Sequence, residues 1–180
     1  MKILMLSNYS LHNKQVVDLT YQNHLNYCAK WNIDLIYTTG KYSPHNNFDE
    51  LINLFNLYDI IITVGTDIFF TNINKNILDF NDPNKLIVLQ DEGTGSINGD
   101  FIIFNKIPNY LKFFNTIKEV DKSFINTQDT IRSLKNMIFI KILPTRNIQS
   151  ICPFGNEQNK KITSLLWQPN DFSVHCHRPR

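Results

Sequence analysis

Charged residues are few in this chain, and the two signs of charge nearly cancel. Among its 180 residues, 18 are Lys or Arg and 16 are Asp or Glu, which gives a formal net charge of +2. A protein that binds nucleic acid electrostatically must neutralise several phosphates with a basic surface. The even balance excludes that class of protein, whereas a small polyanionic ligand remains compatible with it.

Cysteine and long apolar runs are also scarce. Cys28, Cys152 and Cys176 form no Cys-x-x-Cys pair, and one thiol would be left over if two were bridged, so we expect reduced thiols and a reducing compartment. The apolar run at the start of the chain is too short for the core of a signal peptide. No later stretch approaches the ~20 apolar residues of a membrane span. These absences predict a soluble, cytoplasmic protein without a membrane span.

Apolar residues, by contrast, are abundant. Hydrophobic residues make up 42% of the chain and aromatic residues 12%. This content excludes an intrinsically disordered or fibrous protein. A chain of this length can bury a sizeable core, so we expect one compact domain over residues 1–180.

The first 65 residues alternate between short apolar runs and helical patterns. Apolar runs at 2–6, 33–38 and 59–64 predict buried strands, and apolar residues at helical spacing predict helices at 14–30 and 48–57. This alternating order is typical of a parallel sheet with right-handed crossovers. The sequence therefore predicts a Rossmann-like nucleotide-binding half.

The rest of the chain lacks this regular alternation. Candidate strands occupy residues 85–90, 101–105 and 139–143, and amphipathic patterns predict helices at 109–120 and 126–135. There is no internal repeat, linker or low-complexity tract. We therefore predict an α/β fold with a mixed central sheet flanked by helices.

A glycine turn and an aspartate follow the very apolar strand at 59–64. Ligands of open α/β sheets bind beyond the carboxyl ends of the strands, so Asp67 is the first functional candidate. A turn or helix-capping aspartate is the alternative interpretation.

Histidines and arginines cluster near the end of the sequence. His175 and His177, two residues apart in an extended segment, would point to the same side, and Arg178 and Arg180 follow them. Such a segment can offer an imidazole and cations to a phosphate-bound metal. The alternative is a solvated tail with an incidental histidine.

Four segments share their order and motifs with a known family. Residues 23–35 carry Asn-x-x-x-Tyr before a strand, 58–72 a hydrophobic strand with an Asp-x-Asp-like motif, 97–105 an Asn-Gly turn and strand, and 167–175 a Trp…Asp-Phe-x-x-His ending. Together they resemble glycosyltransferases of the GT-A fold, and among them the galactosyltransferase-like group that includes fungal mannan and plant xyloglucan enzymes. The resemblance implies a nucleotide-binding half over 1–72 and a donor-sugar and acceptor half over 73–180.

The resemblance also implies a metal site. Asp67 matches the second aspartate of the motif, and with His175 it would hold Mn²⁺ or Mg²⁺ against the diphosphate of a UDP- or GDP-sugar. Arg178 or Arg180 would add a cation for the phosphates. Gly65 stands where the family has its first aspartate, and this removes a carboxylate that contacts the ribose or a metal-bound water.

The other binding assignments follow from the resemblance for residues 98–100 and from position in the fold for residues 7–9. The turn at 98–100 would border the donor sugar, where Gly99 allows close backbone approach, and an ordinary Asn-Gly turn is the alternative. The residues predicted to contact the nucleotide or donor are Ser7, Asn8, Tyr9, Gly65, Thr66, Asn98, Gly99, Asp100 and Arg178.

The helix at 126–135 opens with a segment that resembles the family's acidic-Gln step, although Thr127 replaces the acid. Asp129 is the candidate base for the acceptor hydroxyl if the enzyme inverts configuration. Gln128 is the candidate to stabilise the oxocarbenium-like state if it retains configuration. A carboxylate that simply favours the helix dipole is the alternative interpretation of Asp129.

These observations predict a metal-dependent glycosyltransferase that moves a sugar from a nucleoside diphosphate sugar to a hydroxyl of a glycan or other acceptor. The alternative is a catalytically weak or inactive relative that binds nucleotide sugars or glycans, which Gly65 and the short chain favour. A nucleotidyltransferase would show a glycine- and lysine-rich loop after the first strand, and this sequence has none there.

Overall fold

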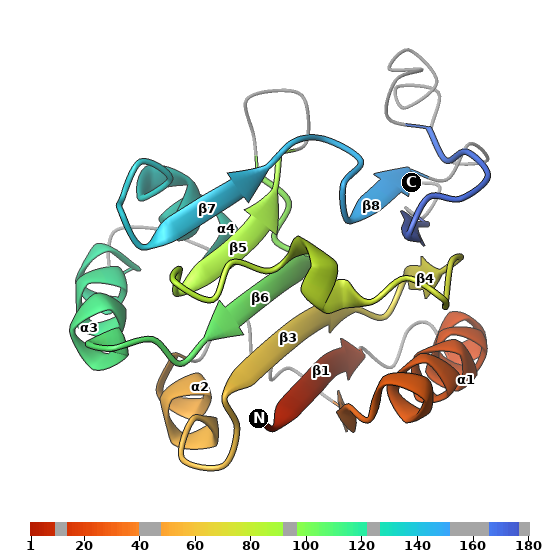
Figure 1. The fold of residues 1–180 in the computed structure, drawn as a ribbon, viewed down its shortest axis with the longest axis horizontal. Coiled ribbons are helices and arrows are strands. Elements are labelled where there is room, and N and C mark those ends of the chain that lie inside the picture. The colour runs from red at the N-terminus through yellow and green to blue at the C-terminus, as the bar shows by residue number, and fades with distance from the viewer. Residues whose placement is uncertain (10–13, 40–47, 92–96, 122–126, 152–165, 177–180) are drawn as a thin grey trace.

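A six-stranded sheet forms the centre of the molecule (Figure 1). The structure is a computed structural model that describes residues 1–9, 14–39, 48–91, 97–121, 127–151 and 166–176. In order across the sheet, the strands are β2 (Asp34–Thr39), β1 (Ile3–Tyr9), β3 (Ile60–Gly65), β6 (Phe101–Asn105), β5 (Ile87–Gln90) and β7 (Ile140–Leu143).

The strands of this sheet run in both directions. β2, β1 and β3 are parallel, β6 is antiparallel to both β3 and β5, and β7 is parallel to β5. Side chains of β3 are buried from Ile60 to Val64, because its β-branched residues suit a strand covered on both faces. The predicted α/β fold, parallel in its first half and mixed in its second, is confirmed.

β1 is longer than its apolar run. The sequence predicts a strand at 2–6, but β1 continues to Tyr9. Ser7 and Asn8 pair with both β2 and β3. Backbone hydrogen bonds to two neighbours therefore extend the strand past the point where its side chains become polar.

The helices lie close to their predicted positions. α2 ends three residues before the predicted end at 57, because the N–H groups of Asn56 and Leu57 bond to carbonyls three residues back, as in a turn. The helices are α1 (Lys14–Trp31), α2 (Phe48–Leu54), α3 (Tyr110–Asp121), α4 (Thr127–Ser133) and the 3-10 helix η3 (Ile77–Phe80).

A smaller sheet lies beyond the carboxyl end of β3 (Figure 1). Its order is β4 (Ile68–Phe70), β9 (Ser173–His175) and β8 (Gln149–Ile151), with β9 antiparallel to β4 and parallel to β8. The predicted extended conformation around His175 is confirmed. The sequence analysis did not identify these three segments as paired strands.

Buried apolar side chains form two clusters, one on each face of the large sheet. In β1, Leu4 and Leu6 belong to the first cluster, whereas Ile3 and Met5 belong to the second, as expected for alternating side chains. Helices α2, α3 and α4 pack into the first cluster. Helix α1, β4 and η3 pack into the second, which places the small sheet and α1 on the same face.

The predictions that the chain has no membrane span and keeps its cysteines reduced can be compared with the described residues. None of the helices described is both long and apolar enough to cross a membrane. Neither Cys28 nor Cys176 takes part in a disulfide within the described ranges, and Cys152 lies outside them.

Candidate functional site

One face of α1 fixes the chain that follows β3. The Thr20 hydroxyl donates to the Thr66 carbonyl at 2.7 Å, and one turn further His24 Nε2 lies 2.7 Å from the Ile68 carbonyl. Side chains three or four residues apart on a helix point to the same side. α1 therefore holds the backbone on both sides of Asp67.

His24 is fully buried, and burial lowers its pKa to about 4, although its hydrogen bond to Ile68 acts in the opposite direction. The ring is therefore neutral near pH 7. Because a carbonyl can only accept, Nε2 carries the proton, and Nδ1 accepts from the Tyr37 hydroxyl at 2.6 Å. Burial raises the pKa of Tyr37 to about 12, so the hydroxyl keeps the proton that it donates.

Further along α1, the same face holds β4 and the chain that leads to η3. Asn23 Nδ2 donates to the Phe70 carbonyl at 3.0 Å, and its Oδ1 accepts from the Phe70 N–H at 2.7 Å. The Tyr27 hydroxyl accepts from the Ile77 N–H at 2.7 Å and donates to the Lys75 carbonyl at 3.2 Å. The Asn-x-x-x-Tyr segment thus positions the chain after β3, a role that the sequence analysis did not assign.

Gly65 leaves room for two neighbouring aspartates. A β-carbon added at residue 65 would lie 2.9 Å from Asp67 Oδ1 and 3.4 Å from the Asp100 Cβ. The Gly65 N–H donates to the Asp100 carbonyl at 2.7 Å, which joins the end of β3 to the start of β6. A side chain at residue 65 would therefore displace the Asp67 carboxylate.

The small sheet brings Asp67 and His175 together. In the pairing of β4 with β9, His175 lies opposite Ile68, and the Cys176 N–H donates to the Asp67 carbonyl at 2.9 Å. The His175 side chain is only 3% exposed, and its Nε2 lies 3.3 Å from Asp67 Oδ2. The same nitrogen lies 3.6 Å from Asp100 Oδ2. Three distant segments thus converge on one imidazole nitrogen.

Asp100 is delivered to this point by the turn that precedes β6. Asn98 is buried, and its Oδ1 accepts from the Asp100 N–H at 2.7 Å, which closes the turn around Gly99. The Asn98 N–H donates to the Gln90 carbonyl at 2.9 Å. The ordinary Asn-Gly turn is present, and it also places a carboxylate beside Gly65.

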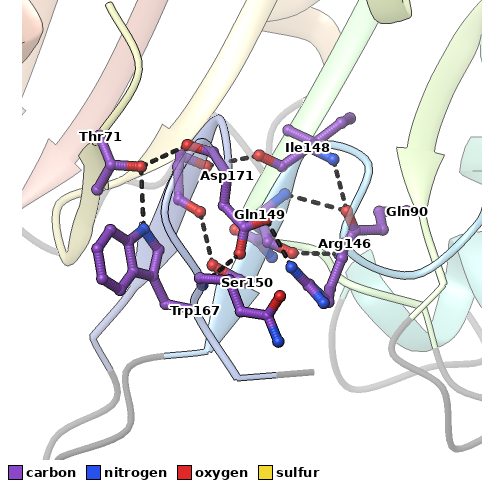
Figure 2. A network of polar contacts seen from close by, with 10 residues as sticks. Thr71, Gln90, Arg146, Ile148, Gln149, Ser150, Trp167 and Asp171 are labelled. Carbon is purple, nitrogen blue, oxygen red and sulfur yellow. Dashed lines mark hydrogen bonds and ion pairs between the residues drawn. The ribbon is translucent and has the colours of Figure 1, made fainter. Parts of the chain in front are cut away.

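Asp171 holds the chain just before β9 (Figure 2). Its Oδ1 accepts from Arg146 Nη2 at 2.7 Å, and its carbonyl accepts from the Thr71 hydroxyl at 2.6 Å. Thr71 also accepts from Trp167 Nε1 at 3.2 Å. The preceding Asn170 has a φ of 76°, a left-handed backbone conformation that asparagine tolerates. These contacts fix where β9 begins.

Gln90 connects the two sheets through a buried amide (Figure 2). Its Oε1 accepts from the N–H groups of Ile148 and Gln149 at 2.7 and 3.0 Å, and its Nε2 donates to the Gln149 carbonyl at 2.8 Å. The sequence analysis assigned no role to Gln90. Nothing in the local pattern distinguishes this glutamine from the last residue of any other strand, because its partners follow nearly sixty positions later.

The end of β1 lies beside Gly65. Asn8 is in register with Gly65 on one side and with Thr38 on the other. Ser7 is completely buried, and its hydroxyl donates to the Val64 carbonyl at 2.9 Å. The structure describes the backbone of Asn8 and Tyr9 but not their side chains.

The predicted catalytic residues belong to α4. Gln128 and Asp129 lie in the first turn of α4, and their side chains are outside the described ones. α4 packs into the first apolar cluster, whereas Ile68, next to Asp67, packs into the second. Arg178 also lies outside the described residues.

The donor atoms suit a hard divalent cation, although the described residues do not form a complete protein cage. No group of three or more His, Cys, Asp or Glu side chains in the described ranges is placed to hold a metal ion. Carboxylate oxygens and an imidazole nitrogen are nevertheless ligands that Mn²⁺ accepts. A site with few protein ligands fits a metal whose other ligands come from substrate phosphates.

Comparison with known proteins gives structural likeness only. No protein-family model matches the chain, and no curated protein matches its sequence. A glycosyltransferase involved in the glycosylation of the major capsid of PBCV-1 has a TM-score of 0.65 at 16% identity, with 97% of this chain and 92% of that one covered.

Two other solved glycosyltransferases are similar. GlyE of Streptococcus pneumoniae TIGR4 has a TM-score of 0.62 at 12% identity, covering 97% of this chain and 55% of that one, so this chain spans about half of GlyE. The galactosyltransferase LgtC, solved with donor and acceptor sugar analogues, has a TM-score of 0.56 at 7% identity, covering 98% and 88%. The mixed sheet flanked by helices is therefore the GT-A fold of glycosyltransferases.

Proposed function

We propose that this chain is a glycosyltransferase that moves a sugar from a nucleoside diphosphate sugar to a hydroxyl acceptor with the help of Mn²⁺ or Mg²⁺. The observation that carries the proposal is the 3.3 Å approach of His175 Nε2 to Asp67 Oδ2, at the carboxyl end of β3. Ligands of open α/β sheets bind at this edge. The shared GT-A fold supports the reaction class, and membership of the mannan and xyloglucan group remains a prediction.

Asp67 and His175 would hold the cation, and the surrounding chain fixes both beforehand. The Asp67 backbone lies between two residues bonded to α1, and its carbonyl accepts from Cys176. His175 is buried in the middle strand of the small sheet. Such preorganisation avoids the cost of moving the ligands during the reaction. The bound cation would supply a Lewis acid for the diphosphate leaving group.

The transfer breaks the bond between the anomeric carbon and the phosphate oxygen, and forms one between that carbon and the acceptor oxygen. The hydroxyl proton must go to a base, and Asp129 is the candidate in an inverting reaction. In a retaining reaction Gln128 would stabilise the positive charge on the sugar. The nucleotide would lie near Asn8, Tyr9 and Thr66, at the ends of β1 and β3.

A non-catalytic relative that binds nucleotide sugars is the second candidate. Gly65 favours it, because the carboxylate of the first motif position is absent from β3. Release of sugar from the donor distinguishes the two functions. Hydrolysis of a UDP- or GDP-sugar with Mn²⁺ supports the enzyme, and binding without hydrolysis supports the relative.

The Asp67→Ala variant tests the proposal. We expect wild-type melting midpoints to rise with UDP- or GDP-sugars only when Mn²⁺ is present, because ligands that bind the native state stabilise it. Asp67→Ala should abolish this rise while the far-UV circular dichroism stays unchanged. Asp34→Ala is a matched control, since Asp34 is exposed at the start of β2, the opposite end of the parallel strands. An unchanged Mn²⁺-dependent rise in Asp67→Ala would refute the proposed site.

A further inference from the structure

We propose that the edge of the large sheet opposite the candidate site binds the surface of an anionic phospholipid bilayer. At this edge β1, β3, β5 and β7 begin and the antiparallel strand β6 ends. The small sheet lies at the other ends of these strands (Figure 1). The inference uses none of the residues of the cation site, and it does not depend on the transfer reaction.

Hydrogen bonds join the segments at this edge into one continuous surface. The Asp59 N–H donates to the Lys2 carbonyl at 2.9 Å, and the Lys106 N–H donates to the Asp59 carbonyl at 2.9 Å. At the other end of the sheet, Lys85 Nζ donates to the Ile138 carbonyl at 2.7 Å. The segments before β1 and β3 and after β6 are therefore neighbours, as are those before β5 and β7.

The segments that flank the strands at this edge are rich in lysine. They carry Lys2, Lys85, Lys106, Lys112, Lys135 and Lys141. The aspartates there are Asp34, Asp59 and Asp82, and Asp82 Oδ2 lies 3.4 Å from Lys141 Nζ. Six lysines against three aspartates leave this edge with a charge of +3, although the whole chain has only +2. The nearly even balance of the chain therefore conceals one positive edge.

Four of these lysines are exposed. Lys2 precedes β1, Lys106 directly follows β6, Lys112 lies in the first turn of α3, and Lys135 precedes the turn into β7. No carboxylate of the described residues forms an ion pair with any of the four. Their charges are therefore accessible to an anionic surface.

Exposed aliphatic side chains lie among these lysines. Leu57, before β3, is 64% exposed, Leu111, next to Lys112, is 49% exposed, and Ile138, before β7, is 80% exposed. Single exposed apolar residues are common on protein surfaces. Here three of them accompany a cluster of lysines, which is the combination that attracts a protein to anionic headgroups and inserts it into the boundary with the acyl chains.

A bilayer fits this combination better than a soluble polyanion does. An acidic protein or a nucleic acid would attract the lysines, but it has no acyl layer to receive Leu57, Leu111 and Ile138. Anionic lipids provide both the charge and the apolar layer. A chain bound through this edge would hold the opposite edge, with the candidate site, away from the bilayer.

The experiment measures how much of the wild-type chain co-sediments with vesicles of phosphatidylcholine, with and without phosphatidylserine. We expect binding only when phosphatidylserine is present, and weaker binding as NaCl is raised, because salt screens the attraction. Lys112→Gln should lower the partition coefficient about fivefold, the effect of one lysine near an anionic surface. Lys118→Gln is the matched control, because it removes the same charge from the last turn of α3 and should leave the partition coefficient unchanged.

A second pair of variants tests insertion of the aliphatic side chains. Ile138→Ser should lower the partition coefficient several-fold, and this loss should persist at high NaCl, because apolar burial is not screened by salt. Leu19→Ser is the control, since Leu19 is 71% exposed on α1, away from this edge. All four substitutions change exposed or partly exposed side chains, so circular dichroism should show folded proteins. If either test variant fails to fold, Lys135→Gln or Leu57→Ser takes its place.

Three results would overturn the proposal. The first is equal binding of the wild type to both kinds of vesicle, or no binding to either. The second is an unchanged partition coefficient in both Lys112→Gln and Ile138→Ser. The third is retention of the wild type on heparin or polyglutamate without binding to vesicles, which would assign the basic edge to a soluble polyanion. None of these results bears on the Mn²⁺ and nucleotide measurements that test the proposed function.

Discussion

The two faces of the central sheet are covered in different ways. On the first face, helices α2, α3 and α4 pack through apolar side chains such as Phe48, Phe114 and Ile131. On the second face, α1 contributes apolar contacts but also polar side chains such as Thr20 and Asn23, which bond to the backbone from Thr66 to Ile77. Apolar burial is non-directional, whereas hydrogen bonds have narrow geometry. The first face therefore stabilises the fold, and the second also sets the position of Asp67.

The largest expected loss of stability comes from the first face, which α2, α3 and α4 cover, and it should leave ligand binding unchanged. Phe114 is completely buried, with ring centroids of Phe48, Phe55 and Phe104 within 6.2 Å. Phe114→Ala should lower the free energy of unfolding in urea by about 3–5 kcal/mol. The folded fraction should keep its Mn²⁺–nucleotide affinity.

Leu111→Ala is the matched control for this variant, because Leu111 lies on the same helix and is 49% exposed. Its effect on stability should stay within about 0.5 kcal/mol, as for most surface substitutions. A loss of nucleotide affinity in folded Phe114→Ala would contradict the separation of the two faces.

The next largest effect is a pH dependence of stability, which we expect from His24 of α1 on the second face of the sheet. The pKa of His24 is about 4 in the folded chain against 6.5 for an exposed histidine, so between these values the unfolded chain binds a proton that the folded chain does not. The free energy of unfolding should therefore fall as the pH drops from 6.5 to 4, by up to about 3 kcal/mol. Urea unfolding at several pH values should show a smaller slope in His24→Gln. Parallel profiles of the two proteins would contradict this role of His24.

The smallest effect on stability should be accompanied by weaker binding. Tyr27→Phe leaves the buried Ile77 N–H without its acceptor, which should lower the free energy of unfolding by about 1–3 kcal/mol. Mn²⁺–nucleotide affinity should fall as well, because the chain after β3 loses a hydrogen bond that positions it. Tyr21→Phe is the control, since Tyr21 lies on the same helix and is 42% exposed. If Tyr27→Phe loses stability while its Mn²⁺–nucleotide affinity stays at the wild-type value, the hydrogen bonds of α1 do not position the binding site.

The main elements of the large sheet were predictable because long apolar runs and helical spacing are local signals. The small sheet was not predictable, although the extended segment around His175 was predicted. Its strands β4, β8 and β9 have only three residues each and pair with partners far away in the chain. The polar residues at 20, 23, 24 and 27 do follow one helix face. Their spacing marks a polar stripe, but it does not reveal that the stripe contacts backbone.

The candidate site also depends on residues far apart in the chain, so local sequence patterns did not predict it. The approach of Asp67 to His175 was expected only through a family resemblance, because no local pattern connects two residues so far apart. The resemblance placed Asp100 near the donor sugar, but its approach to His175 depends on the space at Gly65 and on the pairing of β3 with β6. Both are properties of the folded sheet. Side-chain patterns along one strand do not contain them.

The position of β9 has a consequence for how the protein is made. β9 is the middle strand of the small sheet but the last of the described elements to leave the ribosome, because synthesis runs from the N-terminus. β4 and β8 make no ladder with each other and meet only through β9. A nascent chain that ends before residue 173 already contains all six strands of the large sheet, but it lacks His175. The proposed cation site of Asp67 and His175 is therefore complete only after β9 has been synthesised.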